Sequence, residues 1–305
     1  IIKLIKIEGK IMLKNILSML LLSTLSISIQ AADDLSVNQD IGKPGQAARV
    51  PKDNEFKVCA DQNNLPYSNQ AGEGFENKIA EVIAADLGKD LSYQFWHDRF
   101  GFIRNTLKAY RCDVIIGTNT TYDAVNTTKP YYRAGHVWVY RKDSGYNITD
   151  WDSPDLRKGV IGIVDKSPVS VALNANDLMG NAKPYRLMRN LNKSPGQLVD
   201  DVVSGEIDVA IMWGPIGGYY AKQSKEDLVV NLIPEYSEGN EGLTGKTYWN
   251  ISAGVRKKEN ERRDMIEAAL ERNKDKIKKI MEDFGIPYAE PVFTDRLDGY
   301  SRHKK

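Results

Sequence analysis

The side chains most able to recognise a ligand in this chain are polar or aromatic residues that follow predicted apolar strands. In an open sheet of parallel strands, ligands bind outside the carboxyl ends of the strands. Such side chains can hydrogen-bond, pack against aromatic groups and pair with charges. We therefore predict a cleft in which a ligand or a partner contacts Asn63, Tyr67, Glu76, Arg99, Thr118, Thr120, Asp123, Lys166, Ser167 and Trp213.

The carboxylates in these turns could instead serve in acid–base catalysis. Asp61, Glu76 and Asp123 could form a carboxylate pair, but polar residues in such turns more often have a structural role. The chain has no Gly-x-Ser-x-Gly elbow, no phosphate-binding loop and no Cys-x-x-Cys-His haem motif. We therefore predict no enzyme activity and no cofactor.

Histidine and cysteine are too few and too scattered to predict a metal site. The three histidines, His97, His136 and His303, lie far apart in the sequence. The two cysteines, Cys59 and Cys112, are an even pair, which in an exported chain favours a disulfide. Cys59 lies in the first predicted strand and Cys112 at the start of the third, and these strands are neighbours in a 2-1-3 order. The alternative is two buried free thiols.

Strands and helices of ordinary length alternate along the chain, which predicts parallel βαβ units and an α/β fold. The expected strands in the first half are 56–60, 91–96 and 113–117, with helices over 75–87 and 102–110. The second half starts again with a strand at 159–164, a helix capped by Ser167 with Pro168 in its first turn, a helix at 197–203 and a strand at 208–212. A strand at 249–255 and one charged helix over 259–281 follow.

The first 31 residues are predicted to be an upstream extension and a signal peptide. A basic segment from Met12 is followed by the apolar run 16–29 and by Ser28-Ile29-Gln30-Ala31, a tolerable cleavage site. About 14 apolar residues are too few to span a ~30 Å hydrocarbon core, which argues against the alternative of a membrane anchor. No cysteine follows the run, so no lipid anchor is expected. We predict a periplasmic protein.

The bulk charge gives no reason to expect a nucleic-acid partner. Among 305 residues, 42 are basic and 41 acidic, for a formal net charge of +1. The charged helix over 259–281 is most simply a solvated face, with a partner-docking surface as the alternative.

Four segments carry a resemblance to a known family: 63–69, 72–80, 111–114 and Trp213-Gly214-Pro215. The chain resembles the two-lobed, type II periplasmic solute-binding proteins of the amino-acid-receptor kind. Within them it resembles the quinoprotein-dehydrogenase-associated group, the J accessory proteins of methanol oxidation. The resemblance implies a leader at 32–54, lobe 1 at 55–142 plus 248–287, lobe 2 at 143–247 and a tail at 288–305. Each lobe would be a mostly parallel sheet flanked by helices.

The resemblance also implies that two charged positions are lost. Amino-acid receptors of this kind commonly hold the ligand carboxylate with an arginine and its ammonium with an aspartate. The matching positions here are Ala124 and Trp213, so a simple amino acid is not the expected ligand.

The function implied is that of a non-catalytic helper of the pyrroloquinoline-quinone (PQQ) methanol dehydrogenase. It would act on the dehydrogenase or its precursor in assembly, maturation or activation, with or without a small ligand in the cleft. The alternative is a receptor that feeds an ABC transporter with a ligand other than a simple amino acid, and a periplasmic lyase is a distant third.

Overall fold

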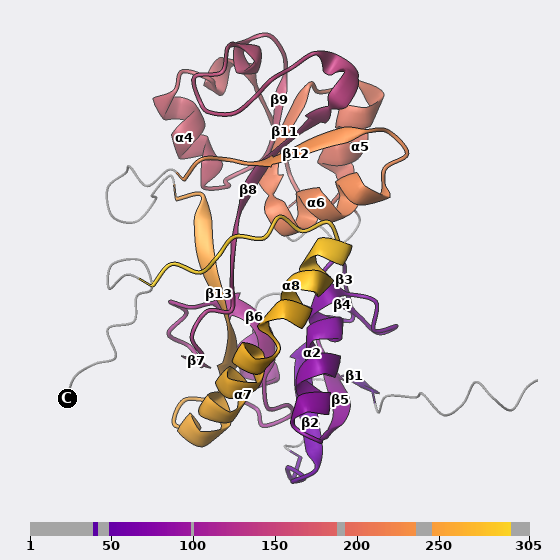
Figure 1. The fold of residues 1–305 in the computed structure, drawn as a ribbon, viewed down its shortest axis with the longest axis vertical. Helices are drawn as coiled ribbons and strands as arrows, with labels where there is room; N and C mark the ends of the chain where they lie inside the picture. The colour runs from indigo at the N-terminus through magenta and orange to yellow at the C-terminus, as the bar shows by residue number, and fades with distance from the viewer. Residues whose placement is uncertain (1–38, 42–48, 99–100, 188–192, 236–245, 294–305) are drawn as a thin grey trace, which may run out of the picture. The chain divides into compact units, whose positions relative to one another are not determined.

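The computed structural model describes residues 39–41, 49–98, 101–187, 193–235 and 246–293. Over these residues the chain has the predicted α/β fold with two lobes, shown in Figure 1. The predicted signal peptide, Arg99 and residues 294–305 of the predicted tail lie outside the described residues.

The first lobe contains a parallel sheet made of short strands. Its order is β1 (Gln39–Ile41), β5 (Asp90–Phe95) and β2 (Glu55–Ala60). Val114 forms a parallel bridge with Val58 on the free side of β2. Strand β2 therefore lies between the second predicted strand and the start of the third, which confirms the predicted 2-1-3 order. Part of the predicted leader supplies β1.

Helix α2 (Phe75–Asp86) places its apolar residues at helical spacing. Phe75, Ile79 and Ile83 are fully buried, since residues three and four apart share one face. At its start the Gly74 N–H donates to the side-chain Oδ1 of Asn77 at 3.1 Å. This bond satisfies one of the N–H groups that have no acceptor within the helix. A Cβ on Gly74 would lie 2.1 Å from the Tyr67 carbonyl oxygen. Only glycine allows the polar turn after β2 to pack so closely on the helix.

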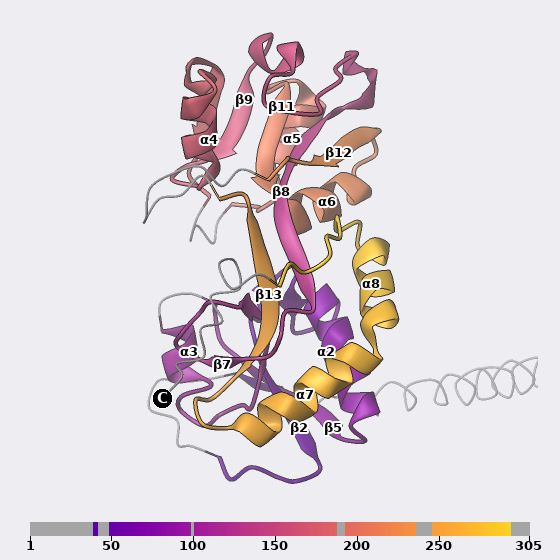
Figure 2. The same cartoon turned by 60° about the vertical axis from the view of Figure 1, so that its left-hand side comes forward.

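The remaining small strands of this lobe form one short hairpin and pairs with a strand from late in the chain. β6 (Ile115–Asn119) and β7 (Asn126–Thr127) pair antiparallel with β13 (Tyr248–Val255), and β3 (Asn63–Asn64) pairs with β4 (Ser68–Asn69). β6 begins two residues later than predicted. Helices α7 (Asn260–Arg272) and α8 (Lys274–Asp283) pack against α2 (Figures 1 and 2).

The second lobe is a sheet covered by helices on both faces. Its order is β10 (Ala182–Tyr185), β9 (Ile161–Val164), β11 (Val209–Trp213), β8 (Tyr132–Arg141) and β12 (Leu228–Leu232). Successive side chains of a strand point to opposite faces. Trp138 and Tyr140 of β8 pack with α4 (Val169–Ala175), while Val137 and Val139 pack with α5 (Gln197–Ser204) and α6 (Gly214–Gln223). Short 3₁₀ turns occur at Lys142–Ser144, Pro154–Arg157 and Met179–Asn181.

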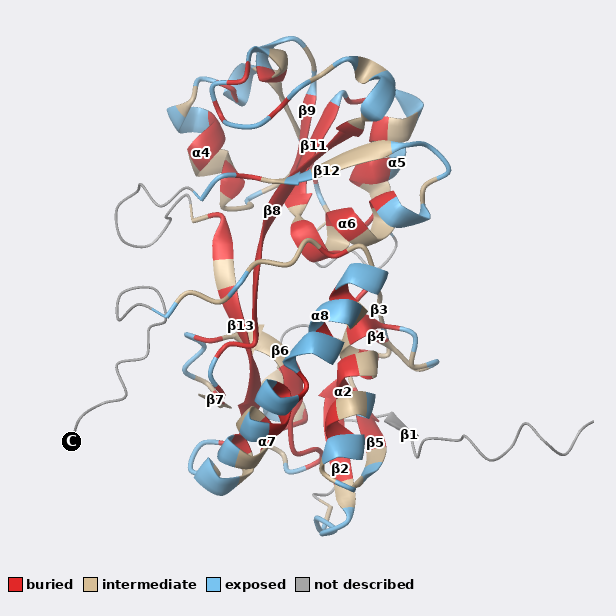
Figure 3. Cartoon of the chain, in the orientation of Figure 1, coloured by how far each residue is buried: buried red, intermediate tan, exposed pale blue. Residues whose placement is uncertain are grey.

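Strand β8 belongs to both lobes. Residues 136–140 pair with β11 on one side, 137–141 pair with β12 on the other, and 132–135 pair with β13. The strand is buried along nearly its whole length, as Figure 3 shows. Its backbone therefore connects the two sheets directly.

The disulfide between Cys59 and Cys112 is present, which confirms the prediction. The two Cα atoms are 5.4 Å apart, and the Cys59 N–H donates to the Val114 carbonyl at 2.8 Å. Both cysteines are buried among Phe102, Leu107 and Val125. Strand adjacency brings the two positions together, as the sequence indicates.

The predicted helix over 102–110 is wrong beyond its first turn. Helix α3 spans only Phe102–Asn105. The Thr106 hydroxyl donates to the Phe102 carbonyl at 2.7 Å, and Tyr110 adopts a left-handed φ of 55°. The buried Arg256 donates to the Leu107 and Cys112 carbonyls, so a residue distant in sequence stabilises the turn that follows α3.

The single helix predicted over 259–281 is two helices. Asn273 separates α7 from α8, with a non-helical ψ of 17°. Its amide donates to the Asp86 carboxylate at 2.8 Å and to the Ala269 carbonyl at 2.9 Å. This buried contact with α2 stabilises the break, which the local charge pattern does not reveal.

Candidate functional site

The cavity around Trp213, here called the tryptophan cavity, has a volume of about 490 Å³. Trp213 ends β11, and the β11–β8 register places it opposite His136. Trp249 comes from the start of β13. The other lining residues are Asn119, Val164, Lys166, Ser167, Pro168, Ile211, Met212, Ile216 and Ile251.

Three rings of this cavity touch one another. The His136 and Trp213 ring centroids are 5.4 Å apart, those of His136 and Trp249 5.8 Å, and those of Trp213 and Trp249 5.5 Å. The interplanar angles lie between 60° and 73°, close to the edge-to-face arrangement that aromatic rings prefer. These rings give the cavity a rigid aromatic wall.

His136 is uncharged in this wall at neutral pH. Burial lowers its pKa to about 4, opposed by a hydrogen bond to the Thr247 backbone. Its Nδ1 lies 3.1 Å from the Thr247 carbonyl oxygen, which can only accept. We therefore assign the proton to Nδ1, which leaves Nε2 as a hydrogen-bond acceptor.

Lys166 and Ser167 also line the tryptophan cavity. Lys166 is exposed and has a left-handed φ of 61°. The predicted Ser167 cap is wrong: Pro168 holds the cap position of α4, and no side chain among the described residues caps the helix. The Ser167 hydroxyl is instead enclosed, without a hydrogen-bond partner in the described part of the chain, because the turn sets this residue one position too early to reach the first open N–H groups.

A smaller cavity of about 250 Å³ contains Tyr67 and Glu76. Glu76 lies at the start of α2 against β6, where a Cβ on Gly117 would lie 2.0 Å from its Oε1. Its carboxyl group is enclosed, although the residue as a whole is only partly buried. Burial, and then the nearby Asp98 carboxylate, raise the pKa of Glu76 to about 8. The Glu76 carboxyl group forms no hydrogen bond or ion pair with the part of the chain that the structure describes.

Tyr67 lies beside Glu76 in this smaller cavity. Burial and the Glu76 carboxyl raise the pKa of Tyr67 far above its ordinary value, while the Trp213 side chain opposes this shift. The effect of Trp213 indicates that the end of β11 lies near the turn after β2.

Thr118 lines a third cavity, of about 380 Å³, together with Ala124, Arg104 and Lys108. Alanine at 124 leaves no guanidinium at that position. The positive side chains here come instead from α3 and the turn after it, and both are exposed.

The structure places three further predicted residues away from these cavities. Asn63 is exposed, and its N–H donates to the Asp61 carboxylate at 2.8 Å. Thr120 is buried, with its hydroxyl 3.0 Å from the Asn250 carbonyl and 2.7 Å from the Ser252 hydroxyl. Asp123 is exposed and lines none of the three.

Two important lining residues were not predicted: His136 and Trp249. His136 carried a signal, because it is the one ionisable side chain that interrupts the apolar run 134–139. Trp249 stands in a run assigned only as a crossover strand. His136 lies beside Trp213 through the pairing of β8 with β11, and Trp249 lies beside β8 through the pairing of β8 with β13; no local pattern gives either.

Over the described ranges, no group of three or more His, Cys, Asp or Glu side chains could hold a metal ion. Nor does any helix in those ranges have the length and apolar character needed to cross a membrane.

Comparison with known proteins identifies the family. The model of the bacterial extracellular solute-binding proteins, family 3, matches residues 56–286. The chain belongs to this family.

Its relatives include J proteins. Protein MoxJ of Paracoccus denitrificans is 30% identical over 243 residues, which cover 76% of this chain and 88% of MoxJ. The crystal structure of MxaJ from Methlophaga aminisulfidivorans MPT superposes with a TM-score of 0.68 at 31% identity, covering 77% of this chain and all of MxaJ. The periplasmic binding protein XoxJ from Methylobacterium extorquens AM1 gives 0.63 at 32% identity, again covering 77% and 100%. These matches confirm the predicted resemblance and the type II fold of this solute-binding protein.

Proposed function

We propose that this solute-binding protein is a periplasmic, non-catalytic accessory protein of the PQQ-dependent methanol dehydrogenase. It would act on the enzyme or its precursor during assembly, maturation or activation. The observation that carries the proposal is the similarity to MoxJ, MxaJ and XoxJ over at least three quarters of the chain, together with the resemblance of its sequence segments to the J proteins of methanol oxidation.

The chemistry of the tryptophan cavity supports this proposal over an amino-acid receptor. An amino acid carries a carboxylate and an ammonium group, and burying either without a partner is costly. The cavity offers two indole rings, a neutral imidazole and the Ser167 hydroxyl, which has no hydrogen-bond partner among the described residues, with a single exposed ammonium group at Lys166. Such walls suit an uncharged or aromatic group, including a side chain presented by a protein partner.

A solute receptor remains the second candidate, and one observation favours it. The tryptophan cavity, at about 490 Å³, is within the size range of small-molecule sites. An uncharged nutrient of moderate size would fit the same rings.

A deletion strain complemented with variants of this chain separates the two candidates. We expect the deletion to reduce methanol dehydrogenase activity per amount of enzyme in the periplasm, and the natural chain to restore it. Trp213→Ala should restore it poorly, because the variant loses the ring contacts with His136 and Trp249. Met179→Ala, a truncation of an exposed apolar side chain in the same lobe, is the matched control. Full dehydrogenase activity in the deletion strain, with lost uptake of a solute, would instead establish the receptor function.

A further inference from the structure

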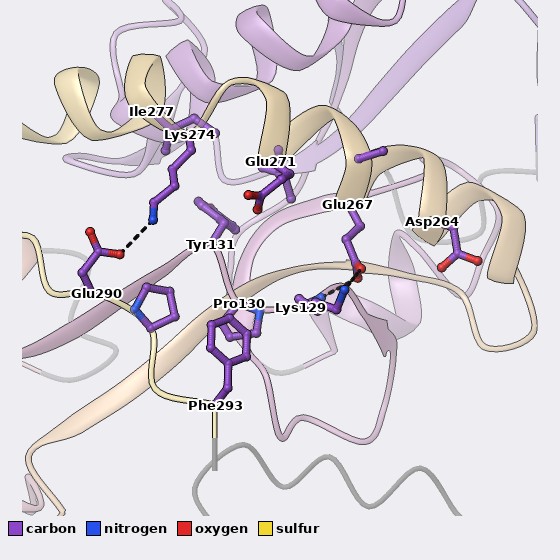
Figure 4. A pocket seen from close by; sticks show the side chains of 13 residues that line it. Lys129, Pro130, Tyr131, Asp264, Glu267, Glu271, Lys274, Ile277, Glu290 and Phe293 are labelled. Carbon is purple, nitrogen blue, oxygen red and sulfur yellow. Dashed lines mark hydrogen bonds and ion pairs between the residues drawn. The ribbon is translucent and has the colours of Figure 1, made fainter. Parts of the chain in front are cut away.

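A second concave surface lies on the first lobe, beside α7, and shares no lining residue with the tryptophan cavity. This α7 groove has a volume of about 640 Å³. One wall is formed by α7 and the start of α8, and the other by residues 129–131 and 290–293, as Figure 4 shows. The lining residues are Lys129, Pro130, Tyr131, Asp264, Glu267, Ala268, Leu270, Glu271, Lys274, Ile277, Glu290, Pro291 and Phe293.

The floor of the α7 groove is apolar and its mouth carries an exposed ring. Tyr131, Leu270 and Ile277 are buried beneath it. The Tyr131 hydroxyl donates to the Ile116 carbonyl at 3.0 Å, so only its ring is offered to the groove. Phe293 is 60% exposed. An aromatic side chain so exposed beside proline residues is typical of surfaces that contact other chains.

Charge is distributed unevenly along the groove. The Lys129 ammonium lies 3.0 Å from the Glu267 carboxylate, and the Lys274 ammonium 3.1 Å from the Glu290 carboxylate. Glu271 projects from α7 between these two ion pairs (Figure 4). Its carboxylate forms no hydrogen bond or ion pair within the described part of the chain, although the Lys274 ammonium is near enough to interact with it electrostatically.

The lining of the groove therefore has four carboxylates against two ammonium groups. Asp264 pairs with the Arg263 guanidinium at 2.6 Å, so Glu271, above an apolar floor, is the lining carboxylate without an ion pair among the described residues. A lysine or arginine side chain fits this combination, since it packs its methylene stem on apolar surface and holds its charge at the polar rim. We propose that the α7 groove binds an extended, lysine- or arginine-bearing segment of a protein partner. The proposal goes beyond the accessory role and does not depend on which protein is the partner.

Titration of the ¹⁵N-labelled chain with the hexapeptide Ac-Leu-Lys-Pro-Arg-Leu-Lys-NH₂ tests the proposal directly. We expect amide shifts concentrated in 129–131, 264–277 and 290–293. Glu271→Gln should weaken binding about two- to fivefold, as expected for one exposed ion pair. Most of that difference should vanish in 0.5 M salt, where the Debye length is only about 4 Å. The control Glu261→Gln removes an exposed carboxylate from α7 outside the groove and should bind as the natural chain does.

Four outcomes would overturn the proposal. One is equal binding of the matched peptide with glutamate in place of lysine and arginine. Others are an equal effect of the Glu271 and Glu261 substitutions, and amide shifts around Trp213 instead of α7. The last is binding that appears only after residues 294–305 are deleted, which would identify the chain's own end as the occupant. Because the probe is a peptide, failure here leaves the dehydrogenase experiment unaffected.

Discussion

Two carboxylates in the first lobe, Asp113 and Glu76, are enclosed by protein and yet differ in their partners. Asp113 forms ion pairs with Arg49 and with Arg256, the latter at 3.0 Å, and Arg262 lies 3.9 Å away. Glu76 has no such partner among the described residues. The charged group that affects its pKa is the Asp98 carboxylate, which raises it.

The difference shows how an enclosed carboxyl group can serve two purposes. A buried charge is tolerated when cations and hydrogen bonds surround it, and otherwise the group becomes neutral. Asp113 connects the strand bridge beside the disulfide to Arg256 after β13, so it contributes to the fold. Glu76 is mostly protonated at pH 7 and lines a cavity together with Tyr67.

The largest expected effect comes from removing the charge of Asp113. We expect Asp113→Asn to lower the free energy of unfolding by about 3–5 kcal/mol, because Arg49 loses an anionic partner and the buried Arg256 keeps only Glu259. Urea unfolding followed by circular dichroism measures this. Asp275→Asn, which changes an exposed carboxylate on α8, is the control. An equal, small effect of both substitutions would mean that Asp113 and Glu76 do not differ as described.

Glu76→Gln tests the other side of the comparison through pH. The pKa of Glu76 rises from 4.5 to about 8 on folding, so between these values the folded protein keeps a proton that the unfolded chain loses. The stability of the natural chain should therefore fall as pH rises from about 5 to 8, by about 1 kcal/mol per pH unit from this group. Glu76→Gln should match the natural chain near pH 5 and exceed it by about 3 kcal/mol at pH 8.

Unfolding at several pH values measures that difference. Glu73→Gln, an exposed carboxylate just before α2, should leave the pH dependence unchanged. Parallel curves for the natural chain and Glu76→Gln would show that Glu76 is ionised in the folded state.

His136 should give a smaller total change in stability, of opposite sign. Its pKa falls from 6.5 to about 4 on folding, so the unfolded chain takes up a proton first as pH falls. Stability from this group is complete above pH 6.5 and should decline by about 2 kcal/mol between pH 6.5 and 5. His136→Phe, which retains a ring beside both tryptophans, should remove this decline. Monitoring the His136 imidazole by NMR gives an independent check, since titration near pH 6.5 would contradict the assignment.

The smallest expected signal is the heat of amino-acid binding. Isothermal calorimetry with the standard amino acids should show no micromolar affinity, because Ala124 and Trp213 supply no charge partner. Arg104 and Lys108 are the side chains that could compensate. If one amino acid does bind, loss of that binding in Arg104→Met would show that the carboxylate partner has moved from the loop after β6 to α3.

Much of the fold was predictable because its signals are local. Phe75, Ile79 and Ile83 define α2 by spacing alone, and the apolar run ending at Trp213 defines β11. The break at Asn273 was not predictable, since it depends on Asp86 almost two hundred positions earlier. The turn after the short α3 likewise depends on Arg256, a residue much later in the chain that donates to the Leu107 and Cys112 carbonyls.

The candidate site was predictable to the extent that it follows strand ends. Tyr67, Glu76, Lys166, Ser167 and Trp213 were chosen in this way, and each lines one of the described cavities. Their roles as contacts for a ligand or partner stay predictions. His136 and Trp249 could not be chosen, because they become neighbours of Trp213 only through the register of two long antiparallel strands.

The pairing of β13 with β6 and β8 determines the order in which the two lobes can complete their folding. The first lobe takes α2 and β6 from the early chain, but β13, α7 and α8 come from residues 248–283. The second lobe, by contrast, is nearly continuous in sequence. As the chain emerges from the ribosome, N-terminus first, the lobe that begins first must therefore be completed last. Until then β6 and one side of β8 remain open edges, and closing this long loop is expected to limit the rate of folding.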